Sequence, residues 1–558
     1  MRTGSHFAQS LGLTFLLAAS AAAQDWSNLG GNAARNGFAY PLGPRTQSVL
    51  WTKTTDPSVI AWAPFVEDKR VFAIRESGFP QNGGAANDAL IAWNLDTGAE
   101  LWRVTLPFGG NTATEWIAWI AGVRDGRIFA ARSNNGMPGP LRAYDAATGA
   151  FLWNSTANTE AWAYDGVVFA PDGDPIVGDF TKVTRIDAVT GTTVWTAPRT
   201  GSVSGNCGAA ASSQAVYIAE PVFGGHVLTR LDLATGARLY SSPLMAGFTS
   251  QNSPFVSHDG KTVYFARSQN NPPVDNLFAF TDNGAAFILQ WSRPIRWTTS
   301  HEHGIGPDGS IYTFLQDDQF VRLDPATGNV LDTAGILSPL GSPNLSAKTA
   351  VDARGTVYVS NGWASSPAGD GRLWAFSPDL ATTYFTINLQ RPNQGGPAVA
   401  EDGTLVMCEL PAVRAWRELN VPQTYCTAKP TSDGCAPPIW ADGVPSATSG
   451  SGFNVGAWQV PATKTGLLFY SKTGAASVPF QGGWLCLAGN VKRTPAQSSG
   501  GSGSCGGAYD LDFNAYVPIS GDAGLVAGAP VWAQFWFRDP LTLSTTGLTN
   551  AVHFVLGP

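Results

Sequence analysis

Three consecutive residues, His301, Glu302 and His303, form the densest group of possible metal ligands in this sequence. On a β-strand, residues two apart point to the same face, so the two imidazoles would lie together, and imidazole is a common metal ligand. A zinc site needs a third ligand, and the sequence shows no obvious one. His301 and His303 are therefore candidate metal ligands, and the alternative is a polar inner strand that binds no metal.

Two acidic segments resemble parts of calcium-binding loops, PDGDP at Pro171–Pro175 and DLDFN at Asp510–Asn514. Neither has the spacing or the trailing bidentate glutamate of an EF-hand, so we expect a turn at the first and a strand with outward acids at the second. The sequence also contains no Gly-x-Ser-x-Gly elbow, no phosphate-binding loop and no defensible set of Ser, His and Asp. It therefore predicts no catalytic residue.

Four tryptophans, Trp62, Trp116, Trp119 and Trp162, precede or begin apolar, strand-length segments in the first third of the chain. They could line the mouth of a channel as a platform for sugar or peptide, because indole combines a large apolar surface with one hydrogen-bond donor. These are the candidate ligand-binding residues. The alternative for most of them is packing in the core or between repeats.

Four of the six cysteines, Cys426, Cys435, Cys486 and Cys505, lie in the last quarter of the chain. In an exported protein an even set of cysteines indicates disulfides, which would constrain the unfolded state of a domain of about 130 residues. Three connectivities are possible. We expect the local one, Cys426 with Cys435 and Cys486 with Cys505.

A repeat supplies the elements that would position these residues. One copy, LIAWNLDTGAELW, combines an apolar strand, an Asp-x-x-Thr-Gly-type turn and a second strand. The turn glycines recur at intervals of roughly 42 to 51 residues, a period in the range of β-propeller blades. The seven copies, two of them degenerate, end at Trp102, Trp153, Trp195, Tyr240, Trp291, Asp332 and Phe385.

A second pattern of strand, turn and strand precedes each copy and occurs eight times. Its copies are centred on Phe72, Phe129, Val177, Tyr217, Tyr264, Tyr312, Tyr358 and Val406. The missing eighth outer strand would come from SVLWTKTT around Trp51, beside VRAWREL around Trp416, which would close the ring and remove its open edges. The sequence therefore predicts an all-β fold with an eight-bladed β-propeller over residues 24–420.

The residue types of the repeat have structural roles. The turn glycine can adopt positive φ, the Asp and Thr side chains can bond to local amides, and the following Trp can wedge between blades, burying about 150–250 Å². Cys207 and Cys408 fall in the fourth and eighth blades, on opposite sides of the ring. We therefore expect both to be unpaired and buried.

The two ends of the chain differ from the repeats. Residues 1–23 combine Arg2 with an apolar run that ends in small residues, which predicts a secretory signal peptide without a lipid-attachment cysteine. Residues 421–558 contain strand-length apolar runs separated by Gly, Ser and Pro, which predicts a small β-sandwich or jelly roll with disulfides.

Composition narrows the range of partners. The net charge is −7, from 34 basic and 41 acidic residues, and no run of Lys or Arg stands out, so nucleic acid and anionic membranes are poor partners. Charged residues make up 13% of the chain, while Gly (63), Pro (38) and Trp (20) are abundant, as in all-β proteins rich in turns. We expect no membrane span and a monomer.

The Ala-x-Asp-x-x-Thr-Gly-x-x-x-Trp segments and the opening DWSNLGGNAARNG, Asp25–Gly37, resemble pyrroloquinoline-quinone (PQQ) enzymes and BamB-type propellers of bacterial envelopes. The resemblance covers roughly Asp25–Asn420. Dehydrogenases of that family carry an adjacent Cys-Cys pair beside the quinone, and this chain has none, so we expect neither PQQ nor calcium. Residues 421–558 resemble a C-terminal domain of exported proteins of planctomycete-type bacteria, through Tyr425–Ala428, Gly483–Leu487 and Gln534–Asp539.

These resemblances imply a secreted protein of the periplasm, cell surface or extracellular space. The leading hypothesis is a non-catalytic binding or scaffold propeller for a protein or polysaccharide partner at the cell envelope. The first alternative is a PQQ-dependent quinoprotein oxidoreductase or another propeller enzyme. The second is a BamB-like outer-membrane assembly factor, against which the absent lipid-attachment cysteine counts.

Overall fold

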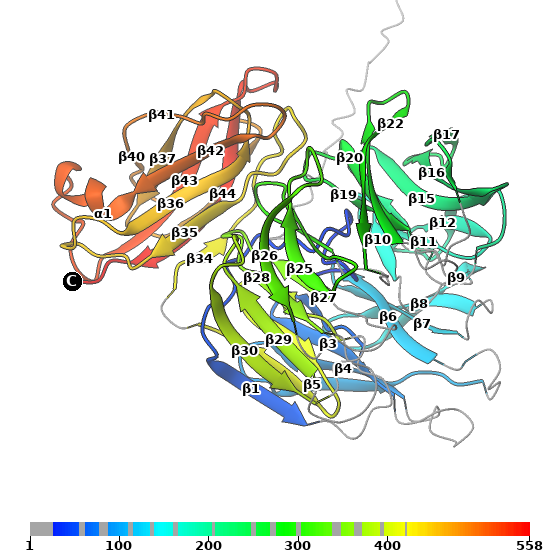
Figure 1. Ribbon diagram of the computed structural model, residues 1–558. Coiled ribbons are helices and arrows are strands. Elements are labelled where there is room, and N and C mark those ends of the chain that lie inside the picture. Colours follow the sequence, from blue (N-terminus) through cyan, green and yellow to red (C-terminus); the bar gives the residue numbers. More distant parts are fainter. Residues whose placement is uncertain are drawn as a thin grey trace, which may run out of the picture.

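The computed structural model describes residues 26–54, 62–76, 88–109, 115, 117–133, 139–159, 166–203, 207–246, 253–267, 275–296, 303–337, 348–361, 371–390, 395–418 and 421–558. The predicted signal peptide lies outside these residues, as do Trp116, Trp162 and the pair His301 and Glu302. Within the described ranges the chain is almost entirely β (Figure 1).

Eight antiparallel sheets with four strands in up-and-down order are present in the described residues. The first consists of β2 (Phe65–Glu67), β3 (Arg70–Arg75), β4 (Ala89–Asn94) and β5 (Glu100–Thr105). The second and third contain β6 (Ile117–Arg124), β7 (Arg127–Ser133), β8 (Gly139–Asp145) and β9 (Phe151–Thr159), then β10 (Val167–Phe169), β11 (Pro175–Gly178), β12 (Lys182–Ile186) and β13 (Thr193–Pro198).

The fourth sheet has an additional strand, β18 (Met245–Ala246), which pairs with β16. The fourth and fifth sheets contain β14 (Ala210–Ala211), β15 (Ala215–Val222), β16 (Gly225–Asp232) and β17 (Arg238–Ser241), then β19 (Phe255–Val256), β20 (Thr262–Arg267), β21 (Asp275–Asp282) and β22 (Phe287–Ile295). The sixth and seventh contain β23 (Gly304–Ile305), β24 (Ile311–Phe314), β25 (Gln319–Leu323) and β26 (Val330–Ile336), then β27 (Lys348–Val351), β28 (Val357–Ser360), β29 (Gly371–Phe376) and β30 (Thr383–Leu389).

The last sheet joins the two ends of the repeat region. Its inner strands are β31 (Ala398–Val399), β32 (Leu405–Cys408) and β33 (Ala412–Trp416), and its outer strand is β1 (Val49–Thr54) from the beginning of the chain. Strand β1 pairs antiparallel with β33, for example Lys53 with Val413. The predicted closure by the N-terminal strand is confirmed, and the molecule is a β-propeller.

Tryptophans hold neighbouring sheets together. The ring of Trp102 lies against Gly149 in the turn of the next sheet, where a Cβ would come within 2.7 Å of a ring carbon. Its Nε1 donates to the carbonyl oxygen of Ala146 at 3.2 Å. The same pair of contacts joins Trp51 to Gly98 and Leu95, Trp153 to Gly191 and Ala188, Trp195 to Gly236 and Leu233, and Trp291 to Gly328 and Pro325.

Side chains of the turn itself fix the turn on which each tryptophan lies. Oδ1 of Asp145 accepts hydrogen bonds from the backbone N–H of Ala147 and Thr148 and from the Thr148 hydroxyl, at 3.0, 2.8 and 2.7 Å. Gly149 then adopts a φ of +73°, which residues with a Cβ rarely adopt. The roles predicted for the repeat are confirmed.

The segment from Trp26 to Leu42 crosses the centre of the ring. Backbone N–H groups at the inner strands of six sheets donate to its carbonyl oxygens. The donor and acceptor pairs are Val66 with Trp26, Val123 with Ser27, Ala211 with Ala33, Val256 with Ala34, Ile305 with Asn36 and Val351 with Gly37. The N-terminal region therefore bridges the end of the ring at which the first strands of the sheets finish. Arg35 of this region is fully buried.

Beyond the propeller, the chain forms two further sheets around one core. One runs in the order β34 (Gln423–Tyr425), β44 (Thr546–Val555), β43 (Pro530–Arg538), β37 (Thr465–Ser471) and β40 (Lys492–Arg493), with β41 (Gln497–Ser498) also on β37. The other contains β35 (Ile439–Gly443), β36 (Phe453–Val460) and β42 (Gly507–Asp512), followed by α1 (Phe513–Tyr516) and η3 (Val517–Ile519). Strands β38 (Ala475–Phe480) and β39 (Gly483–Leu487) form a separate hairpin. The predicted domain boundary after residue 420 falls between β33 and β34, at residues outside the described ranges.

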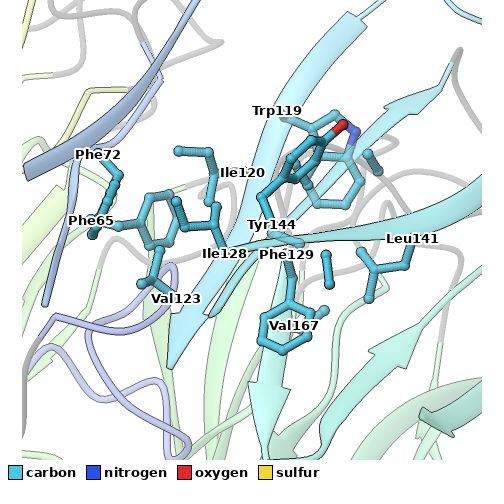
Figure 2. Close-up of a cluster of buried hydrophobic side chains, with 14 of the residues drawn as sticks. Phe65, Phe72, Trp119, Ile120, Val123, Ile128, Phe129, Leu141, Tyr144 and Val167 are labelled. Carbon is cyan, nitrogen blue, oxygen red and sulfur yellow. The ribbon is translucent and has the colours of Figure 1, made fainter. Parts of the chain in front are cut away.

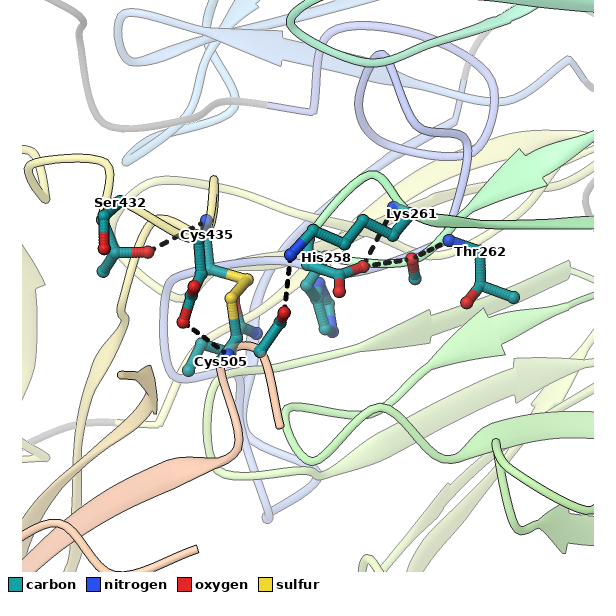
Figure 3. The surroundings of a disulfide bond; sticks show 12 residues. His258, Lys261, Thr262, Ser432, Cys435 and Cys505 are labelled. Atoms are coloured by element: carbon teal, nitrogen blue, oxygen red, sulfur yellow. Dashed lines mark hydrogen bonds between the residues drawn. A yellow bond between two sulfur atoms is a disulfide. The ribbon is translucent and has the colours of Figure 1, made fainter. Parts of the chain in front are cut away.

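The disulfides connect Cys426 with Cys486 and Cys435 with Cys505. The predicted local connectivity is therefore wrong. Hairpin β38–β39 folds back over the larger sheet, where the Tyr425 hydroxyl donates to the carbonyl oxygen of Cys486 at 2.8 Å, and this brings Cys486 to Cys426. The second bond lies beside the propeller (Figure 3).

The two remaining cysteines, Cys207 and Cys408, are free and buried, as predicted. Among the described residues no helix is long and apolar enough to cross a membrane. The two disulfides fit an extracytoplasmic protein.

Replacing a turn glycine tests the contact between neighbouring sheets. In Gly191→Ala the new Cβ would lie 2.6 Å from the Trp153 ring, so the indole must shift. In Gly126→Ala the φ is nearly the same, +72° against +73°, but nothing lies within 4 Å. We expect Gly191→Ala to destabilise the protein by about 1–3 kcal/mol more than Gly126→Ala, seen as a lower thermal midpoint. Equal midpoints would contradict the role assigned to this contact.

Candidate functional site

The two ends of the ring carry different chemistry. In an up-and-down sheet, the turns that follow the first and third strands lie at one end, which is also where the N-terminal segment crosses. The second strands finish at the other end of the ring, and an ionisable residue lies within two residues of the end of several of them. We call this end the polar face, defined by Glu76, Arg132, Asp179, Glu220 and Glu409.

A buried ion pair joins the first two sheets at the polar face. Arg132 Nη1 lies 2.8 Å from Asp88 Oδ2, and the side chains are 0% and 1% exposed. Arg132 Nε also donates to the carbonyl oxygen of Pro107 at 3.1 Å. Because two charges buried together cost little only when they are paired and hydrogen-bonded, this arrangement fixes one sheet against the other.

Two other carboxylates of this face, Glu220 and Glu409, pair with arginines of their own sheets. Glu220 accepts hydrogen bonds from Arg238 at 2.6 Å and from the Thr229 hydroxyl at 2.7 Å. Burial raises the pKa of Glu220, but these bonds outweigh it, so the pKa lies below its ordinary value. Glu409 pairs with Arg414, and here burial dominates and raises the pKa.

Glu76 is the most perturbed acid of the polar face. Its Oε1 accepts a hydrogen bond from the N–H of Ala118 in the next sheet at 3.1 Å. Burial raises the pKa of Glu76 to about 8, and the nearby charge of Asp88 adds to this, against opposing hydrogen bonds from Ala118 and the Trp62 indole. Glu76 is therefore largely protonated at neutral pH, beside the ion pair of Asp88 and Arg132.

The tryptophans predicted as a ligand platform do not form one in the described residues. Trp62 and Trp119 are 5% and 1% exposed and belong to the core between the first sheets. Figure 2 shows Trp119 and Tyr144 among the side chains of this cluster. The interpretation of these two residues as a ligand face is corrected. Trp62 precedes β2 and Trp119 lies in β6, and both strands are surrounded by neighbouring strands at the centre of the ring.

His303 is also buried, which disfavours it as a metal ligand. Its Nδ1 lies 3.0 Å from the Thr313 hydroxyl, and its ring stacks on Phe255 with centroids 4.9 Å apart. Burial lowers the pKa of His303 to about 3, so the ring is neutral. The described residues contain no group of three His, Cys, Asp or Glu side chains that could hold a metal ion, and His301 is not among them.

The two acidic segments have structural partners. Asp172 and Asp174 both bond to Arg185, with 2.9 Å between Asp174 Oδ2 and Arg185 Nε. Asp512 caps α1 by accepting a hydrogen bond from the N–H of Ala515 at 3.0 Å. The turn expected at Pro171–Pro175 is confirmed, and Asp510 lies on β42 with an exposed side chain, as expected.

Sequence reasoning missed Glu76, Asp88 and Arg132. A signal was available, because the same frame ends in an ionisable residue in VFAIRE, IFAAR, PIVGD, VYIAE and VMCE. Five charged residues at similar, though not identical, positions of an apolar repeat indicate that one end of the ring is polar. The pairing of these residues across sheets, however, requires the three-dimensional fold.

Residues 86–334 match the family model described as "Outer membrane protein assembly factor BamB". A quinohemoprotein alcohol dehydrogenase from Comamonas testosteroni aligns with a TM-score of 0.50 and 12% identity, over 74% of this chain and 83% of its own. BamB from Moraxella catarrhalis aligns with a TM-score of 0.44 and 15% identity, over 66% of this chain and 99% of its own. The propeller of Dos1 aligns with a TM-score of 0.47 and 11% identity, over 66% of this chain and 94% of its own. No curated protein matches the sequence.

The described residues do not fit PQQ with a calcium ion. The carboxylates of Asp88, Glu220 and Glu409 are already bonded to arginines of their own or a neighbouring sheet. The two propeller cysteines, Cys207 and Cys408, belong to the fourth and eighth sheets and are not adjacent in sequence. We therefore derive no reaction step through a quinone.

The raised pKa of Glu76 predicts a pH dependence of stability. Its pKa rises from 4.5 to about 8 on folding, so between these values the folded protein binds more protons than the unfolded chain. Its contribution to stability therefore falls as pH rises through this window, by at most about 1.4 kcal/mol per pH unit. Glu76→Gln keeps a neutral polar group, so we expect it to gain stability relative to the parent between pH 5 and pH 8.

Thermal midpoints at pH 5, 6.5 and 8 measure this difference. Glu100→Gln is the matched control, because the pKa of Glu100 is lowered by its hydrogen bond from Arg103 and this carboxyl stays ionised throughout the range. Parallel pH profiles for the parent and Glu76→Gln would contradict the protonated state assigned to Glu76.

Proposed function

Since this chain is a PQQ-like β-propeller protein, we propose that it is a secreted, non-catalytic binding or scaffold protein that holds a protein or glycan partner at the cell envelope. One observation carries the proposal. The charged groups described at the polar face are paired, within one sheet as in Glu220 with Arg238 or between two sheets as in the buried pair of Asp88 and Arg132. Such bonds make the face rigid, and a rigid face suits recognition because little order must be gained on binding.

The carboxylates of the polar face also differ from typical catalytic acids and bases. A catalytic carboxyl must reach a substrate, whereas those of Glu220 and Glu409 accept hydrogen bonds from Arg238 and from the N–H of Gln390. We accordingly propose a function that requires neither PQQ nor calcium.

The difference between the two ends of the ring in the described residues supports binding at the polar face. The N-terminal segment crosses the opposite end, and the C-terminal unit lies against that same end, where Lys261 in a turn of the fifth sheet donates to the Ser504 hydroxyl at 2.5 Å. At the polar face the turn after β15 presents Phe223, which is fully exposed at 102%, and the exposed Leu244 lies near the adjacent Gly224. Exposed aromatic side chains of this kind are frequent anchors in protein interfaces. They favour a protein partner, as does the match to the BamB model.

A propeller enzyme is the second candidate, and Glu76 is the observation that favours it. A buried carboxyl with a pKa of about 8 has the proton affinity of a general acid, and perturbed acids cluster at active sites. Its hydrogen bond to the N–H of Ala118 gives it a structural role as well.

Crosslinking of the mature full-length protein in envelope extract, together with a glycan array, tests the proposal. We expect a defined partner whose affinity falls at least about tenfold in Phe223→Ser, because a truncated interface anchor costs more than 1 kcal/mol. Leu543→Ser is the matched control, since Leu543 is equally exposed but lies in the C-terminal unit. No partner above background by either method, or equal loss in both variants, would count against it.

An activity assay separates the two candidates. The protein is titrated with PQQ and calcium, and alcohol or sugar oxidation is followed with a dye acceptor. We expect no turnover. Turnover that disappears in Glu76→Gln would replace the binding function with an enzymatic one.

A further inference from the structure

Two tryptophans share the outer face of the small sheet of the C-terminal unit. Strands β35 and β36 direct Ile439, Ala441 and Val455 into the core, so Trp440 and Trp458 lie on the opposite face. The two indole rings have centroids 5.9 Å apart and planes within 24° of each other. The two rings are therefore offset-stacked, and together they form an aromatic pair on this face.

Gly456 allows one of these rings to lie close to the sheet. It pairs directly with Trp440, and a Cβ at this position would come within 2.2 Å of Trp440 Cζ2. Any side chain on Gly456 would therefore push the indole away. The glycine is what allows the Trp440 ring to lie against the sheet beside Trp458.

The exposed part of this aromatic pair is carbon. Both tryptophans are partly exposed, yet their Nε1 atoms are buried and have no hydrogen-bond partner among the described residues. Gln459 follows at a bulge with a φ of +59° and 3% exposure, and its Oε1 also has no partner in the described part of the chain. Unsatisfied polar atoms and a strained residue at one place are a cost that functional sites commonly carry.

Carboxylates surround the aromatic pair. In the register of the three strands, Trp440 is opposite Gly456 and Gly456 is opposite Asp510, and Asp442 and Asp512 lie in the neighbouring row. Asp510 is exposed on β42. Because oxygen atoms of carboxylates accept hydrogen bonds from hydroxyl groups and repel anions, these residues select against phosphate and uronic-acid ligands.

The same face adjoins the propeller at two points along the strands. Asp442 bonds to Arg45 at 2.8 Å, and Gln459 Nε2 donates to the carbonyl oxygen of Pro307 at 3.5 Å. The tryptophan pair lies between these two contacts. Junctions between folding units are preferred places for ligand sites.

We propose that Trp440, Trp458 and Asp510 form a binding site for a neutral or amino-substituted sugar chain. A pyranose ring presents a face of C–H groups that packs on the indole carbons, while its hydroxyl groups at the rim donate to Asp510. Few other ligands combine an apolar face with hydroxyl donors around its edge. The site lies on the C-terminal unit and does not depend on the partner proposed for the polar face.

Isothermal titration of the full-length protein with chitohexaose, cellohexaose and polygalacturonate tests the site. We expect at least one neutral or amino-substituted oligosaccharide to bind and the anionic polymer not to bind. Trp458→Ala, Gly456→Ala and Asp510→Asn should each weaken binding at least tenfold. Asp510→Asn is an exposed substitution that leaves the core unchanged, so it remains informative if a tryptophan variant misfolds.

Two control variants make the result specific. Trp532→Ala removes a partly exposed tryptophan on the larger sheet, where it stacks on His553, and should change affinity by less than twofold. Phe223→Ser alters the polar face and should also leave sugar binding unchanged, so this site can fail independently of the proposed function. The inference is overturned if no neutral or amino sugar binds, if Asp510→Asn and Gly456→Ala bind as tightly as the parent, or if only polygalacturonate binds.

Discussion

The propeller depends on one repeated contact, a tryptophan ring that lies on the turn glycine of the next sheet and donates to a carbonyl oxygen of that turn. Each such contact combines a large buried apolar area with a satisfied indole N–H, and it requires a residue without a Cβ on the other side. Trp51 of β1 makes the same contact with Gly98, so the first and last sheets are joined in the same way as other neighbouring sheets of the ring. In the fourth repeat Tyr240 stands at the tryptophan position, and its hydroxyl donates to Asp282 in the next sheet.

This dependence explains which features were predictable from the sequence. The turn, the tryptophan and the closing strand all follow from local residue types at a fixed period. Seven copies of the Asp-x-x-Thr-Gly-type segment, eight copies of the apolar strand pattern and the strand around Trp51 together predicted eight similar sheets. The free state of Cys207 and Cys408 followed from the same period, because it placed them in different sheets. These features require only that each repeat resembles the next.

The incorrect predictions concern relations between segments that do not repeat. Cys426 bonds to Cys486 rather than to Cys435 because a hairpin folds back over a sheet, which the spacing of cysteines does not encode. Trp62 and Trp119 have the residue type of a ligand platform, but strands that begin at the centre of a ring are surrounded by neighbours and become buried. Glu76 was overlooked because an acid at the end of an apolar strand looks ordinary until its burial is known.

The C-terminal unit belongs to the same structure as the propeller. Its core includes Phe38 and Leu42 of the N-terminal segment and Ala353 of the seventh sheet, and the ring of Phe38 also packs edge-on against His258 of the fifth sheet. The N-terminal segment is therefore held between two folded parts, and bonds to the inner strands of six sheets. A unit that shares its core with this segment cannot move away without exposing apolar side chains. The tryptophan pair on its small sheet and the polar face of the ring are thus held in a fixed relation. A partner bound at one of these sites would lie at a defined distance from the other site.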